Sequence, residues 1–433
     1  MSCTFASMHM KPTQLSQFAA GNSRVRLAIA LRALPIMLGV VLLLAGPREL
    51  FGQEPTRWGN ELGEPRLPWI IVPDTLQWPA APLSEPPSPV RALYVNAWAF
   101  GGSRLRSLLE LVRGTEVNSL VIDVKDDTGY LTYRSTVPTA IAIGANTQLR
   151  ARDTRDRLLR LRERGIHPIA RIVVAKDPLL ARRKPEWAIR DKRGGLWFDR
   201  LGFAWVDAYQ DSVWIYAAQL AEEAVRMGFA EIQYDYVRFP DEPPSRRQFA
   251  LYAARAEGES AREGVTQGLA ILRERTKAMG VPFTIDVFGL TTSARGDMGI
   301  GQVWEDLVQH ADAVLPMVYP SHYRRGEYGI RVPNAEPYRV IKKALHDARE
   351  RSRAAGDSTE IRPYYQAFTL GQPRYEPWHV REQIRAGEEL GIDSWVLWNP
   401  RSAYDRGALV PGRRAASSSS GVEAVPPVSQ AIQ

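Results

Sequence analysis

Cysteine is almost absent from this sequence, which has one among its 433 residues, Cys3. Cys3 precedes an apolar N-terminal run, so a mature chain without that run has no disulfide, no thiolate metal site and no cysteine nucleophile. Zinc fingers and thiol enzymes are therefore excluded. Histidine is scarce as well, and neither His167 nor His322 belongs to a pair of histidines with a carboxylate at metal-ligand spacing. We expect no metal site and no other cofactor.

Runs of like charge are also missing. The 56 lysine and arginine residues are scattered among 48 aspartate and glutamate residues, so the formal net charge of +8 gives little support to nucleic-acid binding. Hydrophobic residues make up 45% of the chain and charged residues 24%, as in globular proteins that bury a core. This composition excludes a wholly disordered chain, a collagen-like chain and a protein with several membrane spans.

The two ends of the chain differ from its middle. Residues 33–46 form an apolar run that follows several arginines, and its length suits a secretory signal better than a membrane-spanning helix of about 20 residues. We expect residues 1–46 to be a signal peptide or, if uncleaved, an N-terminal anchor, and the protein to be secreted or held in the periplasm or cell envelope. Residues 47–89 are rich in proline and predict a linker, and residues 406–433 predict a disordered tail.

Residues 90–405 alternate between strand and helix patterns. Eight short runs are rich in β-branched and aromatic residues and nearly continuously apolar, as strands buried on both faces are. The runs are Arg91–Phe100, Ser119–Lys125, His167–Ala175, Glu231–Phe239, Pro282–Gly289, Ala313–Tyr319, Ile361–Phe368 and Ser394–Trp398. The helical patterns are Arg104–Arg113, Thr154–Arg164, Ser212–Met227, Ala261–Met279, Gln302–His310, Tyr338–Ala355 and Pro377–Leu390.

Eight such units predict an α/β fold, a single (β/α)8 barrel of the TIM type. The alternative is a doubly wound open sheet, which usually has a glycine-rich phosphate loop after its first strand. Only Gly101 and Gly102 stand at that place.

A long stretch, Asp177–Tyr209, interrupts the alternation after the third strand. It contains six aromatic residues and three glycines. Long loops in compact domains are usually functional, and aromatic rings at the carboxyl end of a barrel can stack on sugars. The alternative is that these aromatic residues form a local core that seals the side of the barrel.

Three of the predicted strands end in acids: Asp123 in the second, Asp235 in the fourth and Asp286 in the fifth. The fourth and fifth strands are neighbours in a barrel, so Asp235 and Asp286 should approach each other at the carboxyl end, where barrel enzymes place their chemistry. Burial and mutual repulsion can keep one such carboxyl ionised and the other protonated, which is what glycosidic bond cleavage needs.

Each acid also has a structural interpretation. By the two-residue period of a strand, Asp123 shares a face with Lys125, and with Arg171 the two could form an internal ion pair that pins the second strand to the third. Asp286 could simply accept hydrogen bonds from hydroxyl groups at strand ends. Asp235 is the hardest of the three to explain in this way.

The last three predicted strands end in aromatic residues with polar neighbours. Tyr319 and His322 follow the sixth strand, Gln366 lies in the seventh, and Trp398 and Asn399 close the eighth. This combination suits a ligand with apolar ring faces and hydroxyl edges. We expect Trp398 to stack on a sugar, with Gln366 and Asn399 hydrogen-bonded to it. The alternative is that these aromatic side chains fill layers of the barrel.

Four segments resemble a bacterial family of glycoside hydrolases, a domain of unknown function whose (β/α)8 barrel is distantly similar to the α-amylase-like hydrolases. The matching segments are Val121–Gly129, Pro185–Ile189 with Gly194–Trp197, Gly228–Pro240 and Pro316–Tyr323. The resemblance covers about residues 90–405. It implies a secreted or envelope polysaccharide hydrolase, with Asp235 at the strand-four position where related barrels place the nucleophile.

We therefore hypothesise metal-free hydrolysis of O-glycosidic bonds in an extracellular or cell-envelope polysaccharide. Asp235 would be the nucleophile or stabilising carboxylate and Asp286 the general acid/base, while Asp123, Lys125 and Arg238 would set their charges and line the substrate site. The expected partner is a polysaccharide or oligosaccharide, and we expect a monomer that meets a membrane only through an uncleaved N-terminal segment. Two alternatives stay open: a barrel that binds a glycan without cutting it, and a metal-dependent sugar deacetylase.

Overall fold

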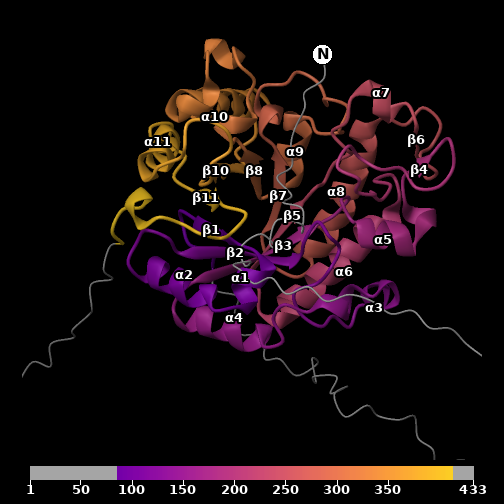
Figure 1. Cartoon of the computed structure of the whole chain (residues 1–433), viewed down its shortest axis with the longest axis horizontal. Coiled ribbons are helices and arrows are strands. Elements are labelled where there is room, and N and C mark those ends of the chain that lie inside the picture. Colours follow the sequence, from indigo (N-terminus) through magenta and orange to yellow (C-terminus); the bar gives the residue numbers. More distant parts are fainter. Residues whose placement is uncertain (1–84, 413–433) are drawn as a thin grey trace, which may run out of the picture. The chain divides into compact units, whose positions relative to one another are not determined.

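Eight parallel strands close into a barrel within residues 85–412, the part of the chain that the computed structural model describes (Figure 1). The strands, in order around the barrel, are β1 (Arg91–Val95), β2 (Ser119–Lys125), β3 (His167–Val173), β5 (Glu231–Asp235), β7 (Phe283–Phe288), β8 (Ala313–Met317), β10 (Tyr364–Gln366) and β11 (Trp395–Trp398). Pairing of β11 with β1 closes the ring. The predicted (β/α)8 barrel is confirmed, and the open doubly wound sheet is excluded.

Helices surround the strands, and all seven predicted helices are present (Figure 1). They are α2 (Arg104–Arg113), α4 (Thr154–Glu163), α6 (Asp211–Met227), α8 (Ala261–Lys277), α9 (Trp304–His310), α10 (Pro337–Ala354) and α11 (Pro377–Glu388). Gly228, in the left-handed conformation at φ 118°, ends α6, and the next residues lead directly into β5. Four shorter helices are α1 (Ala97–Gly101), α3 (Pro138–Ile143), α5 (Pro178–Arg183) and α7 (Pro244–Arg247).

The two faces of each strand have different surroundings. Outward residues such as Ile122 and Ile232 join one large hydrophobic core beneath the helices, whereas inward residues such as Val121 and Ile169 belong to a separate, smaller cluster inside the barrel. Side chains alternate along a strand, so Asp123 follows the inward parity of Val121. The inward positions of β5 and β7 are polar rather than aliphatic, and this gives the interior charged layers.

One charged layer lies at the amino end of the barrel. Glu231, the first residue of β5, accepts hydrogen bonds from Arg362 Nη1 at 2.6 Å and Thr284 Oγ1 at 3.2 Å, and its other oxygen is 3.1 Å from His167 Nε2. Although burial acts in the opposite direction, Arg362 and His167 lower the pKa of Glu231 to about 2. A buried carboxylate and a buried guanidinium are thus matched in this layer.

The first strand is shorter than predicted. The sequence pattern suggests a strand over Arg91–Phe100, but β1 ends at Val95 and the chain turns into α1. Asn96 caps this helix, because its Oδ1 accepts a hydrogen bond from the Ala99 N–H at 2.8 Å. A short apolar run does not distinguish strand from helix by periodicity alone. The consequence is that Trp98, at the carboxyl end of the barrel, is 67% exposed.

The long stretch after β3 contains α5 and a two-residue strand, β4 (Arg190–Asp191), which pairs antiparallel with β6 (Ala250–Leu251). Trp197 and Trp205 are buried there, and Trp205 Nε1 donates to Asp199 Oδ2 at 3.0 Å. These two aromatic residues are part of the large hydrophobic core, so for them the core interpretation holds rather than the sugar platform.

Several predictions on the flanks fall on residues outside 85–412, namely the signal peptide or anchor over 1–46 and most of the linker and tail. The chain continues in contact with the barrel past residue 405, where Ala408 is buried and the Glu116 N–H donates to the Val410 carbonyl at 3.1 Å. None of the helices within the described range has the length and apolar composition needed to cross a bilayer.

Candidate active site

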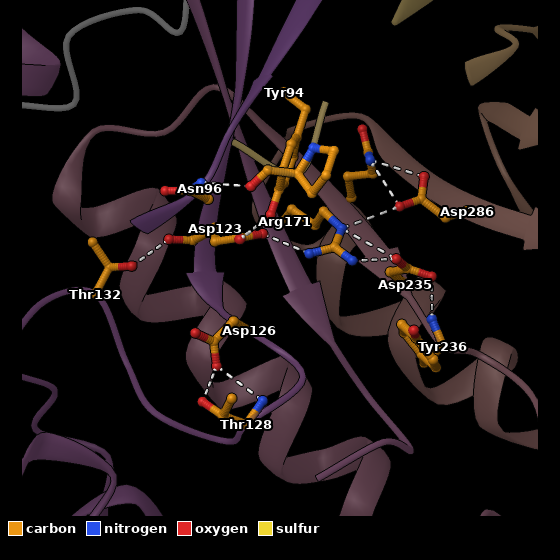
Figure 2. Close-up of polar contacts among 12 residues, drawn as sticks. Tyr94, Asn96, Asp123, Asp126, Thr128, Thr132, Arg171, Asp235, Tyr236 and Asp286 are labelled. Carbon is orange, nitrogen blue, oxygen red and sulfur yellow. Dashed lines mark hydrogen bonds and ion pairs between the residues drawn. The ribbon is translucent and has the colours of Figure 1, made fainter. Parts of the chain in front are cut away.

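One arginine joins three carboxylates at the carboxyl end of the barrel (Figure 2). Arg171 on β3 lies opposite Asp123 of β2, and its Nη1 donates to Asp123 Oδ1 at 2.5 Å. Its Nε donates to Asp235 Oδ2 on β5 at 3.1 Å, and its Nη2 donates to the same oxygen. Asp286 Oδ2 on β7 lies 3.6 Å from Arg171 Nε. Side chains from four neighbouring strands thus form one buried cluster, which we call the Arg171 cluster.

Asp286 has the surroundings of a protonated acid. Gln233 Nε2 lies 2.8 and 3.0 Å from its two oxygens and also donates to the Tyr364 hydroxyl at 2.6 Å. Burial and the neighbouring charge of Asp235 raise the pKa of Asp286 well above its usual range, and Arg171 opposes this shift only in part. Asp286 therefore retains its proton to higher pH than an exposed aspartic acid does.

Asp235 accepts hydrogen bonds only from groups that favour a charged carboxylate. Besides the Arg171 guanidinium, the Tyr236 backbone N–H donates to Asp235 Oδ1 at 2.5 Å. Tyr236 adopts a left-handed conformation, with φ 54°, which is rare for a residue with a side chain. Such strain often occurs at functional sites. Asp235 and Asp286 thus have different surroundings: the guanidinium and a backbone N–H donate to Asp235, whereas burial and the charge of Asp235 raise the pKa of Asp286.

Asp123 is the third acid of the cluster. It accepts hydrogen bonds from Arg171 and, at 2.5 Å, from the Tyr94 hydroxyl on β1. Burial raises the pKa of Asp123 to about 6, although Arg171 and Tyr94 act to lower it. The predicted pair between Asp123 and Arg171 therefore exists, and the same arginine also holds Asp235.

Lys125 does not lie with Asp123, contrary to the prediction that the two share a strand face. The register between β2 and β3 shifts between Asp123 and Lys125, so the regular two-residue alternation fails there. Lys125 Nζ instead bonds to Asp177 at 2.6 Å, at the start of α5, and lies 5.2 Å from the centre of the Tyr216 ring on α6. This lysine joins β2 to the surrounding helices and makes no contact with the three acids.

Arg238 lies outside the Arg171 cluster as well. It forms no hydrogen bond or ion pair with Asp235 or Asp286, and its guanidinium carbon is 4.8 Å from the centre of the Tyr236 ring. Its position near the end of β5 is the predicted one, but its partners are aromatic rings.

Aromatic side chains line the opposite part of the barrel end. Tyr319 stacks on Trp398 with ring centres 5.5 Å apart, and Tyr94 lies 6.0 Å from Trp398. His322 meets Tyr319 edge to face at 5.2 Å, and burial lowers the pKa of His322 to about 4, so this imidazole is neutral near pH 7. Trp398 is partly exposed, as a sugar platform must be. The sequence predicted Tyr319, His322 and Trp398 to lie in one place, and they do.

Gln366 and Asn399 are not free to bind a sugar as predicted. Gln366 Oε1 accepts from the Ser321 N–H and its Nε2 donates to the Phe368 carbonyl, both at 3.0 Å. Asn399 Nδ2 donates to the Ala367 carbonyl at 2.6 Å. These amides hold the loops that carry the aromatic residues. A polar residue at a strand end has the same sequence signature whether it contacts a ligand or a loop.

Sequence reasoning missed the central position of Arg171 and the roles of Tyr94 and Tyr364. A signal for Arg171 was present, because it is the one charged residue in the otherwise apolar segment Ile169–Val174 and shares inward parity with Ile169. Its contact with Asp235 depends on the register between β3 and β5, which no local pattern gives.

Three solved structures illustrate what the chain is similar to. A hypothetical protein from Ruminiclostridium thermocellum ATCC 27405 is 36% identical, with 42% of this chain and 92% of that chain covered and a TM-score of 0.38. The glycoside hydrolase domain of PgaB (BpsB) from Bordetella bronchiseptica is 12% identical, with 72% and 95% covered and a TM-score of 0.52, and it shares the fold. The α-galactosidase TtGalA from Thermus thermophilus is 17% identical, with 73% and 59% covered and a TM-score of 0.43.

No protein with a curated description matches the chain. A family model described as "Putative glycosyl hydrolase domain" matches residues 92–404, which is most of the chain and includes the barrel from the second residue of β1 to the end of β11. The Arg171 cluster and the aromatic residues around Trp398 all lie within this match. The chain therefore belongs to this glycosyl hydrolase family.

Proposed function

We propose that the protein hydrolyses O-glycosidic bonds of an extracellular or cell-envelope polysaccharide, with Asp235 and Asp286 as its two catalytic carboxyl groups. One observation carries the proposal: two acids on adjacent strands contact the same guanidinium nitrogen but have opposite electrostatic surroundings. Asp235 accepts from Arg171 and a backbone N–H, whereas Asp286 is buried against the charge of Asp235. Glycoside hydrolysis needs this division between a carboxylate and an acid.

The geometry supports a retaining reaction. Asp235 Oδ2 lies 3.1 Å and Asp286 Oδ2 3.6 Å from Arg171 Nε, so these two oxygens are at most 6.7 Å apart, the sum of the two distances. Carboxyl groups of retaining enzymes are about 5–5.5 Å apart and those of inverting enzymes about 6.5–9.5 Å. The limit includes the retaining range and leaves out most of the inverting range.

In the proposed reaction, Asp235 attacks the anomeric carbon while the Asp286 proton passes to the oxygen of the breaking glycosidic bond. The first product leaves as an alcohol and the sugar stays as an ester of Asp235. Asp286, now a carboxylate, removes a proton from water, whose oxygen attacks the same carbon and releases Asp235. Arg171 stays charged throughout and stabilises Asp235 when its charge returns.

The test is a reducing-end assay on a panel of bacterial exopolysaccharides with the wild type, Asp235→Asn and Asp286→Asn. Cleavage should fall by on the order of 10²-fold or more in each variant, since each removes a group that acts in the transition state. NMR of the first product should show retained anomeric configuration. Wild-type rates in both variants would exclude the mechanism. Cell fractionation of the natural host checks the proposed extracellular or envelope location.

A second function, glycan binding without cleavage, is favoured by one observation. All three acids of the Arg171 cluster are buried and engaged with protein donors, as in a purely structural ion cluster. Retention of the protein on a polysaccharide column, with no reducing ends released after long incubation, would support this alternative.

A further inference from the structure

Five cations are buried in the described part of the chain, and four of them have carboxylate partners. Lys125 pairs with Asp177, Arg171 with the three acids of its cluster, Lys176 with Asp127 at 2.8 Å, and Arg362 with Glu231. Arg238 is the fifth. No carboxylate oxygen within residues 85–412 lies within 4.0 Å of its guanidinium, although the residue is only 9% exposed. A buried charge without a partner is costly, so its position needs an explanation.

Arg238 lies in a box of three aromatic rings. Its guanidinium carbon is 4.8 Å from the ring centre of Tyr236, 5.4 Å from that of Trp205 and 5.5 Å from that of Phe288. The rings come from the end of β5, the long loop after β3 and the last residue of β7, so the box stands at the carboxyl end of the barrel. Aromatic faces attract a cation, but they leave its hydrogen-bond donors without acceptors.

One edge of the guanidinium has no acceptor. Nη1 donates to the Phe239 carbonyl at 3.1 Å, whereas Nε is buried and has no hydrogen-bond partner. In the range 85–412 the structure gives no partner for Nη2 either. The Nε–Nη2 edge is the one that binds a carboxylate through two parallel hydrogen bonds. A planar anion from outside the chain would complete the coordination of Arg238.

The surroundings of Arg238 favour an anion. Asp241 lies nearby, and four arginines, Arg238, Arg200, Arg247 and Arg324, act on this one carboxyl. Burial nevertheless raises the pKa of Asp241, and its Oδ2 has no hydrogen-bond partner. The other acid of this loop, Glu242, already accepts a hydrogen bond from the Arg200 N–H and pairs with Arg246. Positive charge is therefore in excess here.

The box is also joined to the proposed catalytic acids. Tyr236 contributes its ring to the box and its N–H to Asp235, and Arg238 follows Asp235 by three residues in the chain. A group held by Arg238 would thus belong either to the sugar whose anomeric carbon Asp235 attacks or to a neighbouring sugar of the same polymer.

We propose that Arg238 binds the carboxylate of a uronic-acid unit, so that the substrate of this site is an acidic polysaccharide. That the bound polysaccharide is a substrate rests on the proposed hydrolase function. The preference of the site for a carboxylate can be measured without turnover. The class is carboxylate rather than a neutral sugar because the free edge presents two parallel donors.

The test measures binding in an Asp235→Asn background, which leaves the probes uncut. The probes are oligosaccharides of several bacterial uronic-acid polymers, the same oligosaccharides with their carboxyl groups reduced to neutral alcohols, and a sulfated neutral polymer. In isothermal titration calorimetry the uronic-acid form should bind at least tenfold more tightly than its reduced form. Arg238→Gln should abolish this preference, and Arg238→Lys, which keeps the charge but loses the fork, should reduce it. Arg246→Gln is the matched control, because Arg246 is an exposed arginine nearby in α7, and this variant should keep the preference.

The outcomes separate the two proposals. Equal binding of the acidic and reduced forms, or a preference that survives Arg238→Gln in a protein with unchanged melting temperature, would overturn the inference. Tighter binding of the sulfated polymer than of every uronic-acid probe would also overturn it, because the class is then wrong. If Arg238→Gln does not fold, Arg238→Lys decides by the same comparison. If the protein cleaves only neutral polymers, and this cleavage depends on Asp235, the hydrolase proposal holds and the uronic-acid inference fails. If the protein prefers carboxylates but the wild type cleaves nothing, the uronic-acid inference holds and the hydrolase proposal fails.

Discussion

Two buried arginines at the same end of the barrel are in opposite situations. Arg171 contacts three carboxylates, whereas Arg238 has no carboxylate oxygen of residues 85–412 within 4.0 Å and is surrounded by aromatic rings. Burial, together with an excess of acids over cations, raises the pKa of the least compensated acid, here Asp286, and so favours its protonated form. An excess of cation leaves donors unused and so produces a place for an anion. The same residue type thus supports acid chemistry in one place and recognition in the other, depending on the local charge balance.

The largest effect should come from removing Arg171. Arg171→Met leaves Asp123 and Asp235 buried without a counter-charge, and the loss of one partner from a buried ion pair costs about 3–5 kcal/mol of unfolding free energy. Urea denaturation at pH 7 measures this loss. Arg171→Lys is the control. It keeps the positive charge but lacks the planar set of N–H donors of a guanidinium, so it should retain part of the stability that Arg171→Met loses. A fully stable Arg171→Met protein would mean that the acids do not depend on this arginine.

Activity and stability should separate at Asp286. Asp286→Asn replaces an acid whose raised pKa favours the protonated form, so the unfolding free energy at pH 7 should change little while the hydrolysis rate falls by about 10²–10⁴-fold, the usual contribution of a general acid. Asp235→Asn should lower both, because it also removes a charge that Arg171 needs. Equal loss of stability in the two variants would show that both acids are ionised.

The ion pair of Glu231 and Arg362 at the amino end of the barrel has one acid for one arginine, a charge balance between those of Arg171 and Arg238. The pKa of Glu231 is lowered to about 2, so its contribution to stability is complete above the ordinary glutamate pKa of 4.5 and is lost as the pH falls from there toward 2. The shift corresponds to roughly 3 kcal/mol. In unfolding experiments from pH 6 to pH 2.5, Glu231→Gln should show a flatter acid limb than the wild type. Parallel limbs would assign the acid sensitivity to other carboxyls.

The smallest effect should follow the loss of Arg238. Arg238→Met in the ligand-free protein removes a buried cation without a carboxylate partner, so the cation–π attraction lost and the desolvation cost relieved should nearly cancel, within about 1 kcal/mol. Thermal unfolding beside Arg171→Met makes the comparison direct. A destabilisation as large as that of Arg171→Met would show that the aromatic box is an essential part of the core.

Much of this architecture could be predicted from the sequence, because buried strands and amphipathic helices leave strong local patterns. The closeness of Asp235 to Asp286 could be predicted from the order of the strands alone. Three errors have two causes. The first strand ran into α1 because an apolar run such as Ala97–Phe100 fits either structure. Lys125 was misplaced by a register shift, and Gln366 by loop contacts; both depend on parts of the chain distant in sequence.

The matched layer formed by Glu231 and Arg362 has a consequence for the evolution of this barrel. An aliphatic interior can drift one side chain at a time, because volume is its main constraint. A buried ion pair is more constrained, since replacing Arg362 leaves the Glu231 carboxylate buried without its main counter-charge, and replacing Glu231 leaves Arg362 with only the partly exposed Glu360. Descendants of this chain should therefore retain both residues or exchange them together, and an alignment of homologues should show these two positions changing in concert.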